Sequence, residues 1–341
     1  MQDLQVSVGL VLYNEEKRIL ELLKSLEEQS IGLGSFEVIV VDNDSSDSTL
    51  SLVKDFQSQT QLNLGIIERK ENNIGAGRAD IINAAKADLV AFIDGDCFPS
   101  ATWISELTHQ FSNHKEKFPE LAACGSSAVY SEEHYFARCI YSMSKVFMGH
   151  LNSNQIRRVS ETLVTNHTPT SNVCYDRKKV IDVGNFSSRY PKVCEDVELN
   201  FRLKQAGHSL LFLPSPTVIH QVSPNPLKWF MKIFKYGSGQ FLVIDEHPTH
   251  FQFRLLLPLL FIFAFVSWII LMISDVRFLW LAWVYLAVVT AQSLRAIGGS
   301  NEIVLFPGLI SAFFITHLAY SMGELYGFIR YLLFKLSGVR Q

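Results

Sequence analysis

The sequence carries no marked excess of charge of either sign. Its 30 lysines and arginines nearly balance its 33 aspartates and glutamates, so the formal net charge is −3. A protein that binds nucleic acid through a general electrostatic field needs a basic surplus. We therefore expect no nucleic-acid partner.

Cysteine is scarce and irregularly placed. The number of cysteines is odd, five in 341 residues, and their spacings match no metal-ligand pattern. We expect reduced thiols in a cytosolic compartment. A signal-peptide pattern is also missing, because Met1-Gln2-Asp3 runs straight into a strand-like segment. The cysteines are Cys97, Cys124, Cys139, Cys174 and Cys194.

Asp, Glu, Lys and Arg are missing from three long apolar runs near the C-terminus, which contrast with the ordinary composition of residues 1–250. A run of about 20 apolar residues can cross the hydrocarbon core of a bilayer. We predict a catalytic domain over residues 1–250 and a membrane domain over residues 251–341. The predicted spans lie near 255–274, 278–295 and 303–323.

Basic residues flank these runs and predict their orientation. By the positive-inside rule, the basic residues before the first run place residues 1–250 on the cytosolic side of the inner (plasma) membrane, and Arg295 agrees. The basic residues of the C-terminus disagree with three crossings, so whether the third run crosses or is re-entrant stays open. The two basic groups are Lys228, Lys232, Lys235 and Arg254, and Arg330, Lys335 and Arg340.

The first half of the chain alternates between strand and helix patterns. Continuous apolar runs predict strands, and stripes of apolar residues with a period of 3.6 predict helices between them. This alternation favours an α/β fold with a mostly parallel sheet, whose ligands bind at the carboxyl ends of the strands. The predicted strands are Val6–Leu12, Phe36–Val41, Leu64–Ile67 and Leu89–Ile93.

Polar motifs stand where three of these strands end: Tyr13-Asn14-Glu15, Asp42-Asn43-Asp44 and Asp94-Gly95-Asp96. Two carboxylates around a glycine can hold a divalent cation against a diphosphate, because hard cations prefer oxygen ligands. Taken alone, Asp94-Gly95-Asp96 could equally be a solvated turn. The pair Glu195-Asp196 begins a later amphipathic helix, where the helix dipole favours anions.

Taken in order, these motifs resemble those of family-2 glycosyltransferases over residues 6 to about 240. The matching segments begin at Val6, Val40, Asn73, Phe92 and Cys194. The resemblance implies a GT-A fold, a nucleotide-sugar donor, a Mg²⁺ or Mn²⁺ ion and inversion at the anomeric carbon. The C-terminal part resembles membrane-bound members that build bacterial polysaccharides.

Two departures from the family pattern are visible. Asp80 stands where many relatives have Asn. The Gln-x-x-Arg-Trp motif of processive synthases is absent, and the segment from Lys235 to Gln240 follows instead. This second departure weakens the case for a polymer-extruding synthase.

The resemblance assigns roles to particular residues. Asp196 is the expected catalytic base, since inverting transfer needs a carboxylate to take the acceptor proton. Asp94, Asp96 and His220 are the expected metal ligands. The expected nucleotide-sugar contacts are Tyr13, Asn14, Glu15, Asp42, Asn43, Arg78, Asp94 and Glu195.

Simpler roles stay open for several of these residues. Asn14 and Asp44 can cap helices, and Arg78 can be an ordinary surface arginine of a helix. His220 can be a strand-end histidine bonded to backbone. Cys97 and Cys194 adjoin the motifs, but nothing marks them as nucleophiles.

These features favour a membrane-anchored inverting glycosyltransferase. It would move a sugar from a nucleotide diphosphate sugar, with UDP favoured, to a lipid-linked saccharide or polysaccharide acceptor at the cytosolic face. One alternative is a polyprenyl-phosphate glycosyltransferase. The other is an inactive scaffold in a polysaccharide assembly complex, and the intact Asp94, Asp96 and Asp196 disfavour it.

Overall fold

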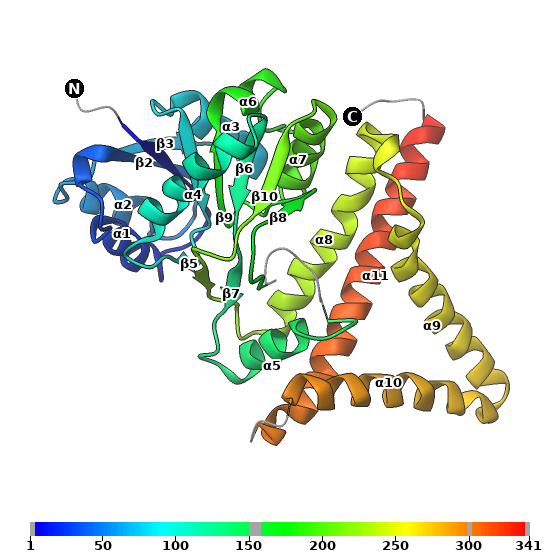
Figure 1. The fold of residues 1–341 in the computed structure, drawn as a ribbon. Coiled ribbons are helices and arrows are strands. Elements are labelled where there is room, and N and C mark those ends of the chain that lie inside the picture. Colours follow the sequence, from blue (N-terminus) through cyan, green and yellow to red (C-terminus); the bar gives the residue numbers. More distant parts are fainter. Residues whose placement is uncertain (1–3, 150–157, 299–301, 338–341) are drawn as a thin grey trace. The chain divides into compact units, whose positions relative to one another are not determined.

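The computed structural model describes residues 4–149, 158–298 and 302–337 (Figure 1). Arg340, one of the C-terminal basic residues, lies outside them. The chain divides into two compact units. The head unit combines Met1–Val129 with Ser153–Gln221, and the helix unit combines Tyr130–Asn152 with Val222–Gln341.

An eight-stranded sheet with the order β3-β2-β1-β4-β9-β6-β10-β8 forms the centre of the head unit. The four strands β3, β2, β1 and β4 run parallel, as the sequence predicts, whereas β9 and β8 run antiparallel to their neighbours. Its strands are β1 (Val6–Leu12), β2 (Phe36–Asn43), β3 (Leu64–Arg69), β4 (Leu89–Ile93), β6 (Leu121–Gly125), β8 (Leu163–Thr165), β9 (Asn172–Asp176) and β10 (Ser209–Phe212).

Helices cover both faces of this sheet, and β1 and β2 are therefore buried on both sides. One core contains Val8 and Leu10 of β1 with the apolar residues of α1, α2 and α4, and the other contains Phe92 of β4 with those of α3, α6 and α7. The helices are α1 (Ile19–Glu27), α2 (Thr49–Gln57), α3 (Ile74–Ala84), α4 (Trp103–Lys117), α6 (Arg177–Asp182) and α7 (Glu195–Gln205).

A second sheet has three strands in the order β5-β11-β7. It contains β5 (Cys97–Phe98), β11 (Val218–His220) and β7 (Ala128–Tyr130). In the antiparallel pair of β5 and β11, His220 lies opposite Cys97. This register brings a residue from the end of the head unit beside the Asp94-Gly95-Asp96 motif.

The helix unit consists of α5 (Tyr135–Ser144), α8 (Pro226–Glu246), α9 (Leu257–Ser274), α10 (Trp280–Ile297) and α11 (Phe306–Ser337). Helices α8 and α11 pack closely because glycines bring their backbones together. A Cβ added at Gly323 would lie 2.0 Å from the carbonyl oxygen of Phe234, and one at Gly237 would lie 2.3 Å from that of Tyr320.

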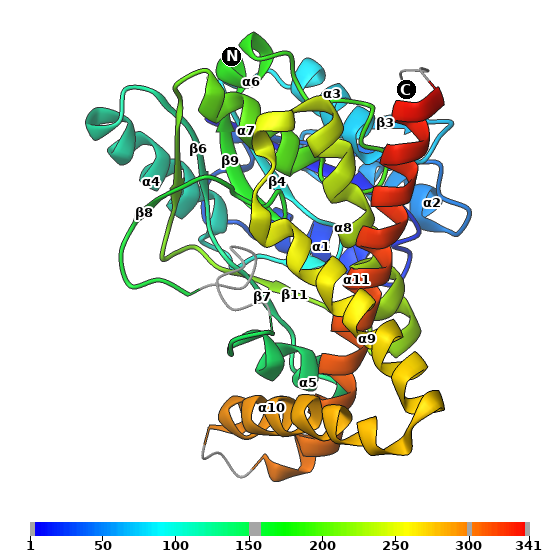
Figure 2. The same ribbon diagram turned by 90° about the vertical axis from the view of Figure 1, so that its right-hand side faces the viewer.

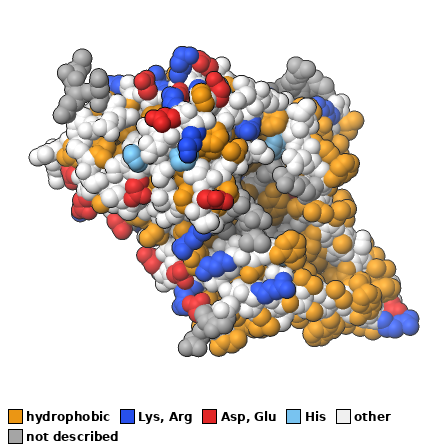
Figure 3. Space-filling model, viewed as in Figure 1, with side chains coloured by type: hydrophobic (Ala, Val, Ile, Leu, Met, Phe, Trp, Pro, Cys, Tyr) orange, Lys and Arg blue, Asp and Glu red, His pale blue; other side chains and the backbone are white. Residues whose placement is uncertain are grey.

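Three segments are long and apolar enough to cross a membrane: Leu257–Ser274, Val276–Ile297 and Ile303–Leu336. Hydrophobic side chains gather over the surface formed by α9 and α10 (Figure 3). These three segments indicate membrane association. The third is longer than the uncharged run that predicts it, because Glu324 and Arg330 continue the helix rather than end it.

The end of α11 lies beside the end of α8 and the start of α9. Lys335 Nζ and Asp245 Oδ1 are 3.3 Å apart, and Leu259 belongs to an apolar cluster with Phe328 of α11. In two perpendicular views, α10 runs across the direction of α11 (Figures 1 and 2). Helices α9, α10 and α11 therefore form the three sides of a frame.

Candidate active site

The loops that follow β1 and β2 are tied to each other at the carboxyl edge of the sheet. The Asn14 backbone N–H donates to Ser45 Oγ (3.0 Å), and the Ser46 backbone N–H donates to Asn14 Oδ1 (2.8 Å). Asn14 has φ of +58° and Asp44 has φ of +67°, a left-handed conformation that Asn and Asp tolerate better than most residues. Asn14 thus fixes the loop as well as lying at the site.

Two buried oxygens at the end of β2 are available to a ligand. Asp42 is 3% exposed and Asn43 1% exposed, and Asp42 Oδ2 accepts from the Ser45 backbone N–H. The Oδ1 atoms of Asp42 and Asn43 have no hydrogen-bond partner among the described residues. Because unsatisfied buried acceptors are costly, this pair points to a donor supplied from outside.

Arg78 connects the strand edge to α7. It is 3% exposed, its Nη2 donates to Asp94 Oδ1 (2.9 Å), and it forms an ion pair with Glu195, itself 4% exposed. The simple role of a surface arginine is therefore wrong. The first turn of α3 comes close to the segment before α7, because Gly75 has no Cβ; a Cβ there would clash with the carbonyl oxygen of Ser187.

Asp80, the departure noted in the sequence, forms an ion pair with Arg69 at the end of β3. Its side chain therefore binds within the head unit.

Asp96 and His220 form the second charged group. His220 Nε2 donates to Asp96 Oδ2 (3.1 Å), and His220 is 1% exposed. Their ligand atoms and the Cys97 sulfur all lie within 4.8 Å of one another. Carboxylate oxygens suit Mg²⁺ or Mn²⁺, so Asp96 fits the divalent ion that the family implies, with His220 beside it as a further donor.

Glu15 lies beside the Asp94-Gly95-Asp96 turn. A Cβ added at Gly95 would come within 3.1 Å of Glu15 Cγ, and Glu15 Oε2 pairs with Arg18 Nη1 (3.1 Å). Burial raises the pKa of Glu15 to about 7, and the negative charges of Asp96 and Asp94 add to this shift, while Arg18 opposes it.

Asp196 occupies the first turn of α7, next to Glu195. Its Oδ2 lies 3.8 Å from Nε2 of His167, and the other ring nitrogen, Nδ1, is 3.0 Å from Nδ2 of the buried Asn200. Because the amide Nδ2 of Asn200 donates, His167 Nδ1 accepts and the ring turns an Nε2–H toward Asp196. The sequence gives no signal for His167, which lies in an irregular segment between β8 and β9.

The structure thus brings the predicted residues into three linked groups. Asn14, Asp42 and Asn43 line the ends of β1 and β2, with Tyr13 46% exposed beside them. Arg78 joins Asp94 to Glu195, and Asp96 joins His220. The pKa of the Cys194 thiol is raised by burial, which agrees with its reading as a non-nucleophile.

The pKa of Glu15 gives a testable pH dependence of stability. A carboxyl whose pKa is raised on folding, here from 4.5 to about 7, stabilises the fold below pH 4.5, and this stability is lost as pH rises through 7. Glu15→Gln removes the titration. We expect equal stabilities for wild type and variant at pH 4, and a variant more stable by about 3 kcal/mol at pH 8.

The exposed Glu28→Gln, directly after α1, is the control, and thermal unfolding of the full chain in detergent is the measurement. A Glu15→Gln variant that gains no stability relative to wild type between pH 4 and pH 8 would contradict the raised pKa.

Comparison with known proteins identifies the family and the fold of the chain. Residues 7–184 match the family described as Glycosyl transferase family 2. The chain is 27% identical to the glycosyltransferase AglE of Haloferax volcanii over 70% of this chain and 73% of that protein. It is 21% identical, over 95% of this chain and 97% of that protein, to the Methanococcus voltae dolichyl N-acetyl-alpha-D-glucosaminyl phosphate 3-beta-D-2,3-diacetamido-2,3-dideoxy-beta-D-glucuronosyltransferase.

Among solved structures, the mannosyltransferase PcManGT of Pyrobaculum calidifontis, in complex with GDP-Man and Mn²⁺, superposes with a TM-score of 0.57. The two chains are 16% identical, and the match covers 100% of this chain and 89% of that one. The predicted GT-A fold is confirmed, with three long apolar C-terminal helices added to it. The chain belongs to glycosyl transferase family 2.

Proposed function

We propose that this chain is a membrane-anchored, inverting, metal-dependent glycosyltransferase. It moves a sugar from a nucleotide diphosphate sugar to a lipid-linked or polysaccharide acceptor at the cytosolic face. The observation that carries this proposal is the Arg78 guanidinium, which ties Asp94 to Glu195 and so holds the proposed base, Asp196, at the strand edge.

The donor's nucleotide binds at the ends of β1 and β2. The unpartnered Oδ1 atoms of Asp42 and Asn43 accept from the N–H groups of the nucleobase, and the exposed Tyr13 ring offers a stacking face. Lys192 Nζ, 5.8 Å from the centre of that ring, adds a positive charge near the expected diphosphate. We propose UDP as the donor's nucleotide, whose uracil N3–H can donate to one of these acceptors.

The diphosphate binds at the Asp94-Gly95-Asp96 turn. Asp94, Asp96 and His220 would hold Mg²⁺ or Mn²⁺, which when bound neutralises the leaving group's charge. The hydrogen bond between His220 Nε2 and Asp96 Oδ2 keeps both side chains at this turn, and binding of the ion through Nε2 would replace that bond. The deep burial of Arg78 directs its charge toward Asp94 rather than toward solvent.

Asp196 takes the proton of the acceptor hydroxyl. As the hydroxyl oxygen forms its bond to the anomeric carbon, the bond from that carbon to the diphosphate breaks, and the configuration inverts. The Nε2–H of His167 faces Asp196 Oδ2 and orients the carboxylate. The backbone N–H of Val197 binds Asp196 Oδ1 (2.8 Å), which leaves Oδ2 for the proton.

A sugar already attached to a lipid is our preferred acceptor. The name of the Methanococcus voltae relative describes transfer onto a dolichyl phosphate-linked sugar, and that relative aligns over almost the whole chain. This favours lengthening of a lipid-linked glycan over direct transfer to polyprenyl phosphate. The three apolar segments would keep the site near such a lipid.

The proposed division places the catalytic domain at residues 1–250 and the membrane domain at 251–341, in the inner membrane. The ion pair of Lys335 with Asp245 supports a C-terminus on the same side as the start of α9. The basic residues before α9, Lys235 among them, and those at the end of α11, Arg330 among them, both favour the cytosolic side. This requires an even number of membrane crossings between the start of α9 and the C-terminus.

The metal proposal predicts that Asp96→Ala abolishes the metal-dependent part of nucleotide binding. Calorimetry of UDP and GDP with and without Mn²⁺ measures it on the full chain in detergent. The matched control is the exposed Asp182→Asn on α6. Equal, tight binding of nucleotide in the presence of chelator would argue against the metal role.

The base proposal predicts that Asp196→Asn removes transfer and spares donor binding. Asn keeps the shape but cannot take a proton, and loss of a general base costs about 10²–10⁴-fold in rate. Glu195→Gln is the contrast, because loss of its charge leaves the buried Arg78 underpaired and should weaken donor binding. Near-wild-type transfer by Asp196→Asn, or a product of retained configuration by NMR, would refute the mechanism.

The topology proposal predicts the side on which fusion reporters are read. We expect a cytosolic readout after residue 250, an external readout after residue 276 and a cytosolic readout at the C-terminus. The physical reason for the last is the contact between Lys335 and Asp245. Reporters at residue 250 and at the C-terminus on opposite sides of the membrane would disprove it.

A further inference from the structure

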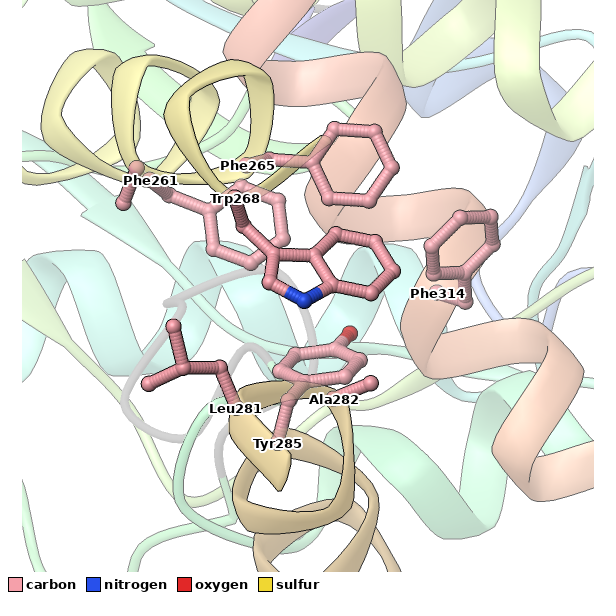
Figure 4. Close-up of a pocket in the computed structure, with 8 residues that line it drawn as sticks. Phe261, Phe265, Trp268, Leu281, Ala282, Tyr285 and Phe314 are labelled. Atoms are coloured by element: carbon pink, nitrogen blue, oxygen red, sulfur yellow. The ribbon is translucent and has the colours of Figure 1, made fainter. Parts of the chain in front are cut away.

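The frame of α9, α10 and α11 encloses a cavity of about 390 Å³, here called the frame cavity. Phe261, Phe265 and Trp268 of α9, Ala282 and Tyr285 of α10 and Phe314 of α11 line it. The Trp268 ring lies at the centre of this group, with the other aromatic rings around it (Figure 4). A cavity of this volume is within the range of sites for small ligands.

The wall of the frame cavity is apolar in effect as well as in composition. The indole N–H of Trp268 donates to the carbonyl oxygen of Phe278 (3.0 Å), and the Tyr285 hydroxyl pairs with His317 Nδ1 (2.9 Å). Both polar groups are therefore already hydrogen-bonded within the helix unit. Water gains little in such a space, because a buried water needs two to four polar partners.

His317 fixes the position of Tyr285. Its Nε2 lies 2.9 Å from the carbonyl oxygen of Met148, and a carbonyl can only accept, so Nε2 carries the hydrogen. Nδ1 is then the acceptor for the Tyr285 hydroxyl. The hydroxyl is held toward His317, and the ring lines the cavity.

The frame cavity is accessible from the surroundings of the frame. Phe314 is 38% exposed and the lining residue Ala264 is also exposed. Around them the outer faces of the frame carry exposed apolar side chains, among them Phe263 and Ile270. In a membrane those surroundings are hydrocarbon, so a hydrocarbon chain is the chemistry that reaches and fills this space.

We propose that the frame cavity binds the hydrocarbon chain of the lipid that carries the acceptor saccharide. This rests on the proposed function. The walls are rigid aromatic rings, which have few side-chain torsions and offer broad faces for dispersion contacts. The name of the Methanococcus voltae relative describes a dolichyl phosphate-linked acceptor, so the occupant that we expect in this cavity is a polyprenyl chain rather than an acyl chain.

Trp268 gives a direct readout of occupancy. The full chain is placed in phosphatidylcholine nanodiscs with brominated polyprenyl phosphate. The fluorescence of Trp268 is obtained as the difference between wild type and Trp268→Phe, and its quenching by the brominated lipid is measured. We expect this component to be quenched by brominated polyprenyl phosphate well below the mole fraction at which brominated phosphatidylcholine quenches it. Equal quenching by the two lipids would mean that ordinary acyl chains fill the cavity, and would overturn the proposal.

Two alanines of α10 provide a matched pair of variants. Ala282 lines the frame cavity, whereas Ala287 is exposed on the same helix and does not line it. We expect Ala282→Phe to weaken the apparent affinity for polyprenyl phosphate about tenfold, and Ala287→Phe to leave it unchanged. Equal affinities for the two variants would refute the site. If Ala282→Phe does not fold, Ala264→Phe fills the cavity from its exposed side.

A kinetic comparison separates this proposal from the proposed function. With a long-chain lipid acceptor, Ala282→Phe should raise KM and leave kcat unchanged, and with a short-chain acceptor both should match wild type. No transfer by the wild-type protein would argue against the proposed function alone, because the quenching experiment still reports on the cavity. Transfer that is normal for both acceptors in Ala282→Phe would refute the cavity as the acceptor's lipid site.

Discussion

The buried guanidinium of Arg78 is the interaction on which the candidate site depends. It pairs with Asp94 after β4 and with Glu195 at the start of α7, two segments about a hundred residues apart. Removing one partner of such a buried group costs about 3–5 kcal/mol, because a charge is left uncompensated. The close approach of α3 at Gly75 makes the contact possible, and through it the position of Asp196 depends on the strand edge.

The same edge collects more negative charge than Arg78 neutralises. Glu15, Asp94 and Asp96 lie close enough together that the last two contribute to the raised pKa of Glu15. Arg18 opposes that shift only in part. Burial is the main cause of the raised pKa of Glu15, and this crowding of negative charge adds to it. A divalent cation at Asp96 and His220 would relieve the repulsion. The metal proposal and the Glu15 titration are therefore linked through the charges of Asp94 and Asp96.

Which parts of this site are predictable from the sequence follows from how local each one is. The three motifs after β1, β2 and β4 are predictable because parallel strands bring their carboxyl ends to one edge. Arg78 is ambiguous in sequence, since its burial depends on a segment more than a hundred residues later. His167 is invisible for the same reason: it meets Asp196 only through the packing of α7 and the contact with Asn200. His220 reaches Asp96 through the register of β11 and β5, which no local pattern reveals.

The helix unit inverts the polarity of a soluble protein. On α10 the polar Gln292 and Ser293 are buried, whereas Trp283 and Val284 are 68% and 52% exposed. Apolar side chains facing outward are stable only if the surrounding solvent is hydrocarbon, which agrees with the hydropathy of the three segments. If the three apolar segments lie in a bilayer, the head unit joined to them is held at the membrane surface. The acceptor that we propose is lipid-borne and would diffuse in that same surface, so the helix unit and the acceptor would be confined by one physical constraint, the cost of exposing hydrocarbon to water.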